Sequence, residues 1–178
     1  MFAAVGISPY VRQLRQAVGH GLLVLPSAAV LPRASDGRVL LVKVIDTGQW
    51  AVIGGAVEPD ESPRDAAIRE CEEEAGVRVS LGRILGVLGG PEFRLTYPNG
   101  DQTSYVSTVF EATVVGGSPR PDGDETSDVK WWSPEGLPYH EMSDFTRALL
   151  AAVGFEAHER PHSSQKSIPS TDLSHFDD

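Results

Sequence analysis

The sequence has a single cysteine among its 178 residues. One cysteine cannot form an intramolecular disulfide, so a disulfide-stabilised secreted fold and a zinc site made only of cysteines are both excluded. Lysine and arginine are also scarce, 15 against 25 aspartates and glutamates, which gives a formal net charge of -10. Nucleic-acid binding depends on clustered basic side chains that contact phosphates, so we expect no nucleic-acid partner. The acidic balance suits a site that collects divalent cations.

Long hydrophobic runs are absent as well. The longest apolar stretch, residues 22–31, is interrupted by Pro26 and Ser27, whereas a membrane helix needs about 20 apolar residues. The N-terminus lacks the basic and apolar regions of a secretory signal. We therefore expect a cytoplasmic protein with no membrane partner. Hydrophobic residues make up 40% of the chain, enough for one folded domain, expected at residues 1–156, while the polar segment 157–178 is expected to be a flexible tail.

Hydrophobic periodicity and turn residues predict a mixture of helices and strands. Helices are expected at Tyr10–Val18, Ser62–Ala75 and Ser143–Val153. Strands are expected at Leu22–Leu31, Arg38–Val44, Gln49–Val57, Arg83–Leu88, Phe93–Tyr97, Ser104–Val115 and Val129–Ser133. The turn at residues 35–37 predicts that the first two strands form a hairpin, and the turn at residues 98–101 predicts a second hairpin.

The predicted helix at Ser62–Ala75 carries three carboxylates on one face. With about 100° per residue, Glu73 and Glu74 lie within about 60° of Glu70 on either side. Three residues fall on the opposite side and are expected to pack on the core: Ile68, Cys71 and Ala75. Like charges at this spacing destabilise an isolated helix unless cations neutralise them. Oxygen ligands of this kind suit Mg²⁺ or Mn²⁺.

A solvated acidic helix face is the ordinary explanation of such a charge run, and Glu72 is expected to be only that. For the other three glutamates the surrounding sequence favours a site. A Gly-Gly turn, Glu61 and Arg69 precede them at fixed offsets. Segment 54–77 thereby resembles the signature of the Nudix hydrolases, a Gly, five residues, a Glu, seven residues, and then Arg-Glu-aliphatic-any-Glu-Glu-any-Gly-aliphatic.

Every fixed position of that signature is occupied, by Gly55, Glu61, Arg69, Glu70, Glu73, Glu74, Gly76 and Val77. Two positions depart from the usual pattern. Cys71 stands where an aliphatic residue is usual, and a buried cysteine behaves as a small hydrophobic residue. Ile53 replaces the proline that often precedes the paired glycines. The resemblance extends from about Tyr10 to Val153.

The resemblance implies an α+β fold, an α/β/α sandwich around a mixed β-sheet. It implies hydrolysis of a pyrophosphate bond in a nucleoside diphosphate derivative: ADP-ribose or another nucleotide sugar, a nucleoside triphosphate, or a dinucleoside polyphosphate. It also implies that Mg²⁺, with Mn²⁺ as an alternative, is bound by a set of carboxylates and one carbonyl: Glu70, Glu73, Glu74 and Gly54. Glu61 and Arg69 are expected to orient those carboxylates by charge-assisted hydrogen bonds.

The general base in many similar proteins comes from a loop before a late strand. Glu125 is our candidate, its loop neighbours Asp124 and Asp128 are alternatives, and Glu73 is the rival within the helix. The candidate substrate contacts are Trp50, Gly55, Arg94 and Tyr105. Phe93 and Tyr97 lie on the same predicted strand as Arg94 and are also weighed as contacts of a base or ribose, although aromatic residues on strands more often belong to the core.

Two other functions are compatible with the same scaffold. One is a non-catalytic domain that binds a nucleotide as a sensor, against which the intact signature argues. The other is an isomerase of diphosphate-bearing prenyl substrates, which needs a protonating Cys or Glu pair outside the signature, whereas the only cysteine lies within it. A homodimer is also considered, because short N-terminal helices in similar proteins often pack against a partner.

Overall fold

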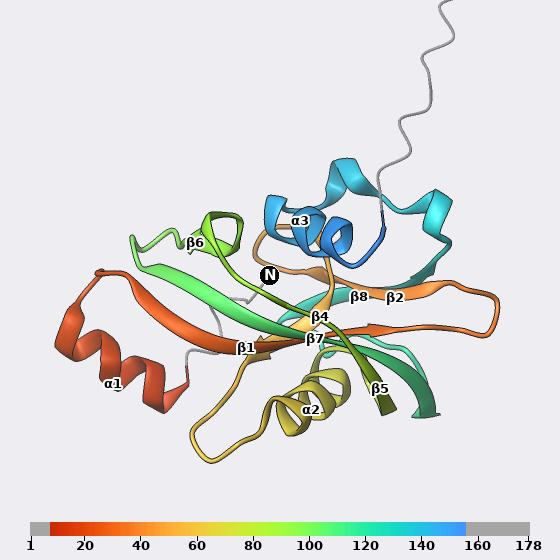
Figure 1. The fold of residues 1–178 in the computed structure, drawn as a ribbon, viewed down its shortest axis with the longest axis horizontal. Coiled ribbons are helices and arrows are strands. Elements are labelled where there is room, and N and C mark those ends of the chain that lie inside the picture. Colours follow the sequence, from red (N-terminus) through yellow and green to blue (C-terminus); the bar gives the residue numbers. More distant parts are fainter. Residues whose placement is uncertain (1–7, 156–178) are drawn as a thin grey trace, which may run out of the picture.

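The computed structural model describes residues 8–155, and the predicted tail 157–178 lies outside the described residues. Two β-sheets form its centre (Figure 1). The larger sheet has the order β4-β1-β7-β5, with β6 also paired to β7. Its strands are β1 Leu23–Pro32, β4 Ile53–Ala56, β5 Val77–Leu88, β6 Arg94–Thr96 and β7 Gln102–Gly117. The smaller sheet, in the order β3-β2-β8, contains β2 Val39–Val44, β3 Trp50–Ala51 and β8 Thr126–Trp132.

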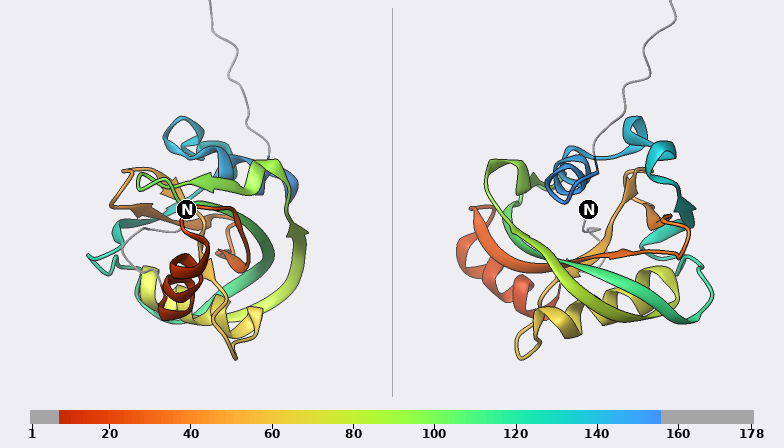
Figure 2. Two further views of the ribbon diagram at one scale, coloured as in Figure 1. Left: turned by 90° about the vertical axis from the view of Figure 1, so that its left-hand side faces the viewer. Right: turned by 45° about the vertical axis from the view of Figure 1, so that its right-hand side comes forward.

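Helices cover the sheets on two sides. Helix α2, Pro63–Ala75, lies on one side and α3, Asp144–Ala152, on the other, as both views in Figure 2 show. One buried cluster of apolar side chains lies on the α3 side and includes Phe145 and Leu149. A second lies on the α2 side and includes Cys71 and Phe110. Because β1 pairs with β7 in parallel and with β4 antiparallel, the sheet is mixed, and the expected α/β/α sandwich is confirmed.

Local sequence signals set the ends of the helices. Ser62 caps α2 in a capping box with Asp65, and Gly76 ends it in the left-handed conformation with φ 65°. Helix α1, Pro9–Val18, is capped by Ser8 and followed by Gly19. Short 3-10 helices occur at Pro91–Phe93, Pro134–Gly136 and Tyr139–Glu141. No helix within residues 8–155 is both long enough and apolar enough to span a membrane.

Two expectations about the strands are wrong. The strands before and after the turn at 35–37 do not form a hairpin, because β1 and β2 belong to different sheets and only a bridge between Arg33 and Val39 joins their ends. Parallel pairing of β1 with β7, from Leu23 opposite Thr103 onward, takes the edge that a hairpin would use. The single strand expected at 49–57 is divided after Ala51, so that β3 and β4 contribute to different sheets.

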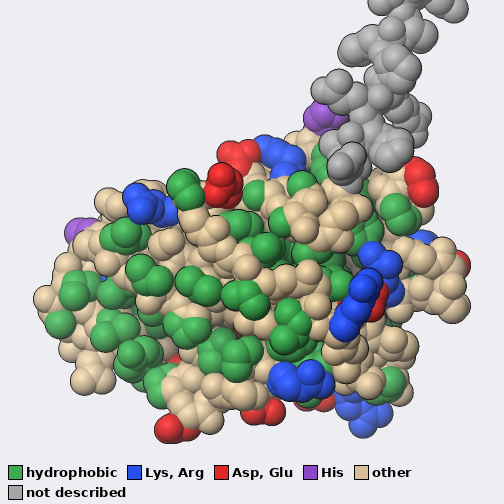
Figure 3. All heavy atoms as spheres, viewed as in Figure 1, with side chains coloured by type: hydrophobic (Ala, Val, Ile, Leu, Met, Phe, Trp, Pro, Cys, Tyr) green, Lys and Arg blue, Asp and Glu red, His purple; other side chains and the backbone are tan. Residues whose placement is uncertain are grey.

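One part of the larger sheet is not covered by helices. Figure 3 shows hydrophobic side chains gathered over the face formed by β1, β7 and β5. Val24, Val87 and Val106 belong to these strands and are between 43% and 66% exposed. Since α2 and α3 cover other parts of the sheets, this face is an apolar area of the molecular surface.

Candidate active site

A cavity of about 330 Å³ lies beside α2. One end is lined by the Gly-Gly turn of β4 and by charged residues of α2, among them Arg69, Glu70, Glu73 and Glu74. The other end is lined by α1 and by the hairpin that joins β6 to β7. Its volume is within the range of small-molecule binding sites.

The turn of β4 and helix α2 fit together through their glycines and glutamates. The backbone N–H of Gly54 donates to Oε2 of Glu74 at 3.0 Å. At Gly55 an added Cβ would lie only 1.9 Å from Oε1 of Glu70. Glycine at this position therefore leaves the space that the Glu70 carboxylate needs beside the turn.

The acidic face of α2 is turned into the protein further than the helical wheel predicts. Glu70 is 7% and Glu74 5% exposed, whereas Ile68, expected on the packing side, is 37% exposed. The helix packs on β4 and β1 with the face that contains Ala67 and Cys71 at its centre. The helical-wheel prediction defined the packing face of α2 by its apolar residues alone. It therefore placed the centre of that face too far from Glu70 and Glu74.

Burial has an electrostatic consequence for these two carboxylates. It raises the pKa of Glu70 to about 7, with the neighbouring Arg69 guanidinium opposing that shift. Burial likewise raises the pKa of Glu74 from its ordinary value of 4.5 to about 8, and the nearby Glu70 carboxylate adds to the rise. The pair is therefore costly to ionise unless further positive charge lies close by.

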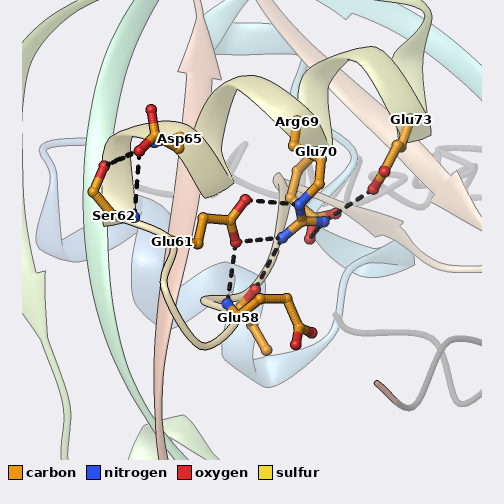
Figure 4. A network of polar contacts seen from close by, with 8 residues as sticks. Glu58, Glu61, Ser62, Asp65, Arg69, Glu70 and Glu73 are labelled. Carbon is orange, nitrogen blue, oxygen red and sulfur yellow. Dashed lines mark hydrogen bonds and ion pairs between the residues drawn. The ribbon is translucent and has the colours of Figure 1, made fainter. Parts of the chain in front are cut away.

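Arg69 connects the carboxylates of the signature (Figure 4). Its Nε and Nη2 donate to the two oxygens of Glu61, at 2.9 and 3.0 Å, in a bidentate pair. Its Nη1 donates to Glu70 at 2.7 Å and to Glu73 at 2.9 Å. The hydrogen bonds from Arg69 lower the pKa of Glu61. Glu61 itself does not line the cavity; it holds the Arg69 side chain in position.

Glu73 is the exposed member of the acidic group. Its side chain is 56% exposed and borders the cavity. Arg69 Nη1 bonds one oxygen of Glu73 and one of Glu70. In this arrangement, within residues 8–155, no three His, Cys, Asp or Glu side chains are gathered closely enough to hold a metal ion.

The loop before β8 brings Glu125 to the same cavity. Oδ1 of Asp122 accepts hydrogen bonds from the N–H groups of Asp124, Glu125 and Thr126, at 3.1, 3.0 and 2.8 Å. The Thr126 hydroxyl donates to the backbone carbonyl of Glu74 at 2.7 Å, which attaches the loop to the end of α2. Burial, followed by the charges of Asp122 and Glu73, raises the pKa of Glu125. A carboxylate with a raised pKa at a cavity wall is suited to accept a proton.

Comparison with known proteins identifies the family. The NUDIX domain model matches residues 24–153, most of the chain. This chain belongs to the Nudix family. Nudix enzymes act on small nucleotide substrates and generally use a divalent metal such as Mg²⁺. The family model, together with relatives named as nucleoside triphosphatases, identifies this chain as a pyrophosphohydrolase.

The alignments with individual Nudix relatives extend over most of this chain. It is 31% identical over 161 residues to a MutT-like protein of Streptomyces ambofaciens, covering 90% of this chain and 97% of the relative. It is 34% identical over 127 residues to the nucleoside triphosphatase NudI of Salmonella heidelberg, covering 67% of this chain and 90% of the relative. A crystal structure of a MutT NUDIX hydrolase from Burkholderia pseudomallei superposes with a TM-score of 0.58 at 27% identity, covering 75% and 98% of the two chains.

The structure brings most of the expected Nudix site residues together and leaves two apart. Trp50 does not line the cavity, because β3 directs it into the core on the α3 side, where it packs edge-on against Trp132 at 5.2 Å. Arg94 is exposed on β6, outside the cavity lining. The remaining expected residues at its walls are Gly54, Gly55, Arg69, Glu70, Glu73, Glu74, Tyr105 and Glu125.

Several residues of the far wall of the cavity were not expected from the sequence: Arg15, Asn99 and Thr103. Tyr97 and Tyr105, which lie after the signature and were weighed as contacts of a base or ribose, line it with them. The contact that joins α1 to β7 links Arg15 and Thr103, which are 88 residues apart in the chain. No local pattern marks such a pair, because each residue is ordinary within its own segment.

Proposed function

We propose that this chain hydrolyses the pyrophosphate bond of a nucleoside triphosphate or a related nucleoside diphosphate derivative, with Mg²⁺ as its cofactor. The observation that carries the proposal is the pair of buried carboxylates, Glu70 and Glu74, packed against a Gly-Gly turn at one end of a cavity. Nucleoside triphosphates are placed first because a relative that shares most of its length with this chain is named a nucleoside triphosphatase.

The residues at this end fit a divalent cation by their chemistry. Glu70, Glu73, Glu74 and the carbonyl of Gly54 are oxygen donors, which are the ligands that Mg²⁺ prefers. Two of these carboxylates are buried with raised pKa values, so a cation beside them would favour their ionised forms. Glu73 would join these ligands when a cation is bound, because its side chain is 56% exposed. When bound, Mg²⁺ offsets the charge of the phosphate oxygens and makes water a better nucleophile.

The remaining residues of the site orient its charged groups or accept a proton. Arg69, held by Glu61, keeps Glu70 and Glu73 in place and carries positive charge at the end of the cavity proposed for the diphosphate. Glu125 accepts the proton of the attacking water, because its loop holds it at the cavity and its pKa is raised. Glu73 is the alternative base. The Gly-Gly turn allows the substrate to come close to the backbone.

The test is a screen of purified protein with Mg²⁺ against nucleoside triphosphates, ADP-ribose and a dinucleoside polyphosphate, with the products separated by ion-exchange chromatography. The proposal expects Mg²⁺-dependent cleavage to a nucleoside monophosphate and a second phosphate-bearing product. A Glu73→Gln, Glu74→Gln double variant is the control for a contaminating hydrolase. If the wild type forms no more product than this variant from any of the nucleotides, the hydrolase proposal is overturned in favour of a nucleotide-binding sensor.

A further inference from the structure

The cavity continues from the Nudix signature to a second wall with a different character. That wall is formed by Val11 and Arg15 of α1, Leu25 of β1, Tyr97 of the β6–β7 hairpin, and Thr103 and Tyr105 of β7. Apolar and aromatic groups alternate there with hydroxyls, whereas the signature end is lined with carboxylates. The two ends suit different parts of one ligand.

Arg15 is a fixed charge at the base of this wall. Its side chain is only 11% exposed. Nη1 donates to the carbonyl of Gly21 at 2.6 Å, and Nη2 donates to the carbonyl of Gln102 at 2.8 Å and to Oγ1 of Thr103 at 2.9 Å. Nε lies 3.4 Å from a carboxylate oxygen of Asp101. These contacts commit the guanidinium to the protein, so its role is to orient neighbouring groups.

A chain of hydroxyls leads from Arg15 into the cavity. Thr103 accepts from Arg15, and the Tyr105 and Tyr97 hydroxyl oxygens are 2.8 Å apart. Between these two contacts, hydrogen bonding by the Thr103 side chain acts to lower the pKa of Tyr105, against the larger effect of burial. A positive charge at one end favours the orientation in which every O–H in the chain points away from it. Thr103 then donates to Tyr105, and Tyr105 donates to Tyr97. In this orientation the proton of the Tyr97 hydroxyl is the last in the chain, and among residues 8–155 this hydroxyl has no hydrogen-bond partner besides Tyr105.

We propose that Tyr97 determines part of the substrate specificity by donating this hydrogen bond to an acceptor atom on the base of the bound nucleotide. The inference rests on the proposed function and names a contact at the end of the cavity away from the signature. A phosphate does not suit this wall, because Arg15 is committed and the buried carboxylate of Asp101 would repel it. A flat heteroaromatic ring suits it, because Val11, Leu25 and the tyrosine rings offer apolar and aromatic surface.

Asn99 also lines this wall, but its amide is already used. Nδ2 of Asn99 donates to Oδ2 of Asp101 at 3.0 Å, and Oδ1 of Asn99 accepts from the backbone N–H of Asp101 at 3.0 Å. The amide therefore holds the turn of the hairpin. Asp101 in turn is paired with His20, whose Nδ1 lies 2.7 Å from Oδ1. Tyr97 is the donor that the hydroxyl chain presents to a ligand.

The experiment compares Tyr97→Phe with the wild type on dGTP, dATP, dCTP, dUTP and ADP-ribose, with KM and kcat measured separately. On the substrate that the wild type uses best, Tyr97→Phe should raise KM about three- to tenfold, the effect of one neutral hydrogen bond. The value of kcat should stay within twofold, because the contact is remote from the bond that breaks. Tyr10→Phe, which alters an exposed tyrosine of α1 outside the cavity lining, should change neither constant.

Thr103 tests the orientation of the hydroxyl chain. Thr103→Val removes the link to Arg15 and allows the Tyr105–Tyr97 bond to reverse, so KM should rise about twofold or more. Thr103→Ser keeps the hydroxyl and should restore the wild-type value. Equal KM values for the wild type and Thr103→Val would overturn the orienting role of Arg15.

The outcomes separate this inference from the proposed function. If the wild type cleaves neither these nucleotides nor a dinucleoside polyphosphate with Mg²⁺ or Mn²⁺, the proposed function is overturned and the base contact with it. If the wild type is active and Tyr97→Phe has an unchanged KM on the preferred nucleotide, only the role of Tyr97 is overturned. Thermal unfolding of each variant shows whether a change in KM arises from a loss of folding instead.

Discussion

The backbone N–H of Gly54 donates a hydrogen bond to the buried carboxylate of Glu74, which lies 20 residues further along the chain. This contact joins the turn of β4 to the last turn of α2. Oγ1 of Thr126 donates to the carbonyl of the same Glu74 and so attaches the Glu125 loop at the same place. The end of α2 is thus where the turn, the acidic helix face and the late loop meet.

Gly55→Ala should damage the site with little effect on the remainder of the fold. The new Cβ would lie 1.9 Å from Oε1 of Glu70, so the carboxylate must move away from the turn. We expect kcat/KM to fall at least tenfold and the Mg²⁺ concentration for half-maximal rate to rise, because Glu70 is a proposed ligand. Gly89→Ala is the matched control, since its nearest neighbour would be at 3.7 Å. An unchanged Mg²⁺ requirement in Gly55→Ala would contradict the placement of Glu70.

Glu74→Gln should stabilise the metal-free protein at high pH. The folded-state pKa of Glu74 is raised from 4.5 to about 8, so the folded state holds more protons than the unfolded state over that interval. Its contribution to stability is full below pH 4.5 and is lost as the pH rises toward 8. Glutamine does not titrate and keeps an acceptor for the Gly54 N–H.

The measurement is thermal unfolding in EDTA across that pH range. We expect Glu74→Gln to exceed the wild type by about 1 kcal/mol or more at the alkaline end, roughly 2–4 °C in Tm, and to match it at the acidic end. Glu72→Gln, on the exposed side of α2, should follow the wild-type curve. A Tm difference between Glu74→Gln and the wild type that is independent of pH would show that the carboxyl does not titrate as argued.

Arg69→Lys should lower activity although it preserves the charge. Lysine cannot reproduce the bidentate pair with Glu61 while also bonding Glu70 and Glu73. We expect kcat to fall at least tenfold. Arg83→Lys serves as the control, because the pair of Arg83 with Glu111 is on the surface. Full turnover in Arg69→Lys would mean that the fork of hydrogen bonds does not position the glutamates.

Glu125→Gln should lower kcat about 10²- to 10⁴-fold, the usual contribution of a general base. KM and the Mg²⁺ requirement should stay close to those of the wild type, because the group acts mainly in the transition state. Asp124→Asn, in the same loop, and Asp128→Asn, which the structure places on β8 and not in the loop, are controls; both residues are exposed and outside the cavity lining. Full turnover in Glu125→Gln together with an inactive Glu73→Gln would place the base on α2.

The sequence predicted those parts of the fold that depend on local signals. Helix α2 was expected at Ser62–Ala75 and is observed at Pro63–Ala75, because the cap, the proline and the terminal glycine lie within the segment itself. The turn at 98–101 likewise forms the expected hairpin, with Thr96 opposite Gln102. The hairpin of β1 with β2 was wrong, because the parallel partner of β1 lies about 80 residues away, as the bond between Ser27 and Ser107 shows.

The candidate site was predictable to the extent that the Nudix signature contains it. Gly55, Glu70 and Glu74 are fixed by spacing within one turn and helix, and the two carboxylates lie against the backbone of that turn. The far wall was less predictable, because Arg15 and Tyr97 come from segments far apart in the chain that meet where α1 contacts β7. Trp50 was misplaced because the division of its strand between two sheets decides which way it faces.

The most direct test of the account is the turnover of Glu73→Gln and of Glu74→Gln on the best nucleotide substrate at saturating Mg²⁺, beside the wild type and Glu72→Gln. All four proteins should unfold cooperatively, so that rates are compared among folded molecules. We predict that Glu73→Gln and Glu74→Gln each lose two or more orders of magnitude in kcat, roughly 3 kcal/mol of transition-state stabilisation, while Glu72→Gln keeps the wild-type rate. Near-wild-type turnover in either of the first two variants would contradict the claim that the acidic face of α2 carries the reaction.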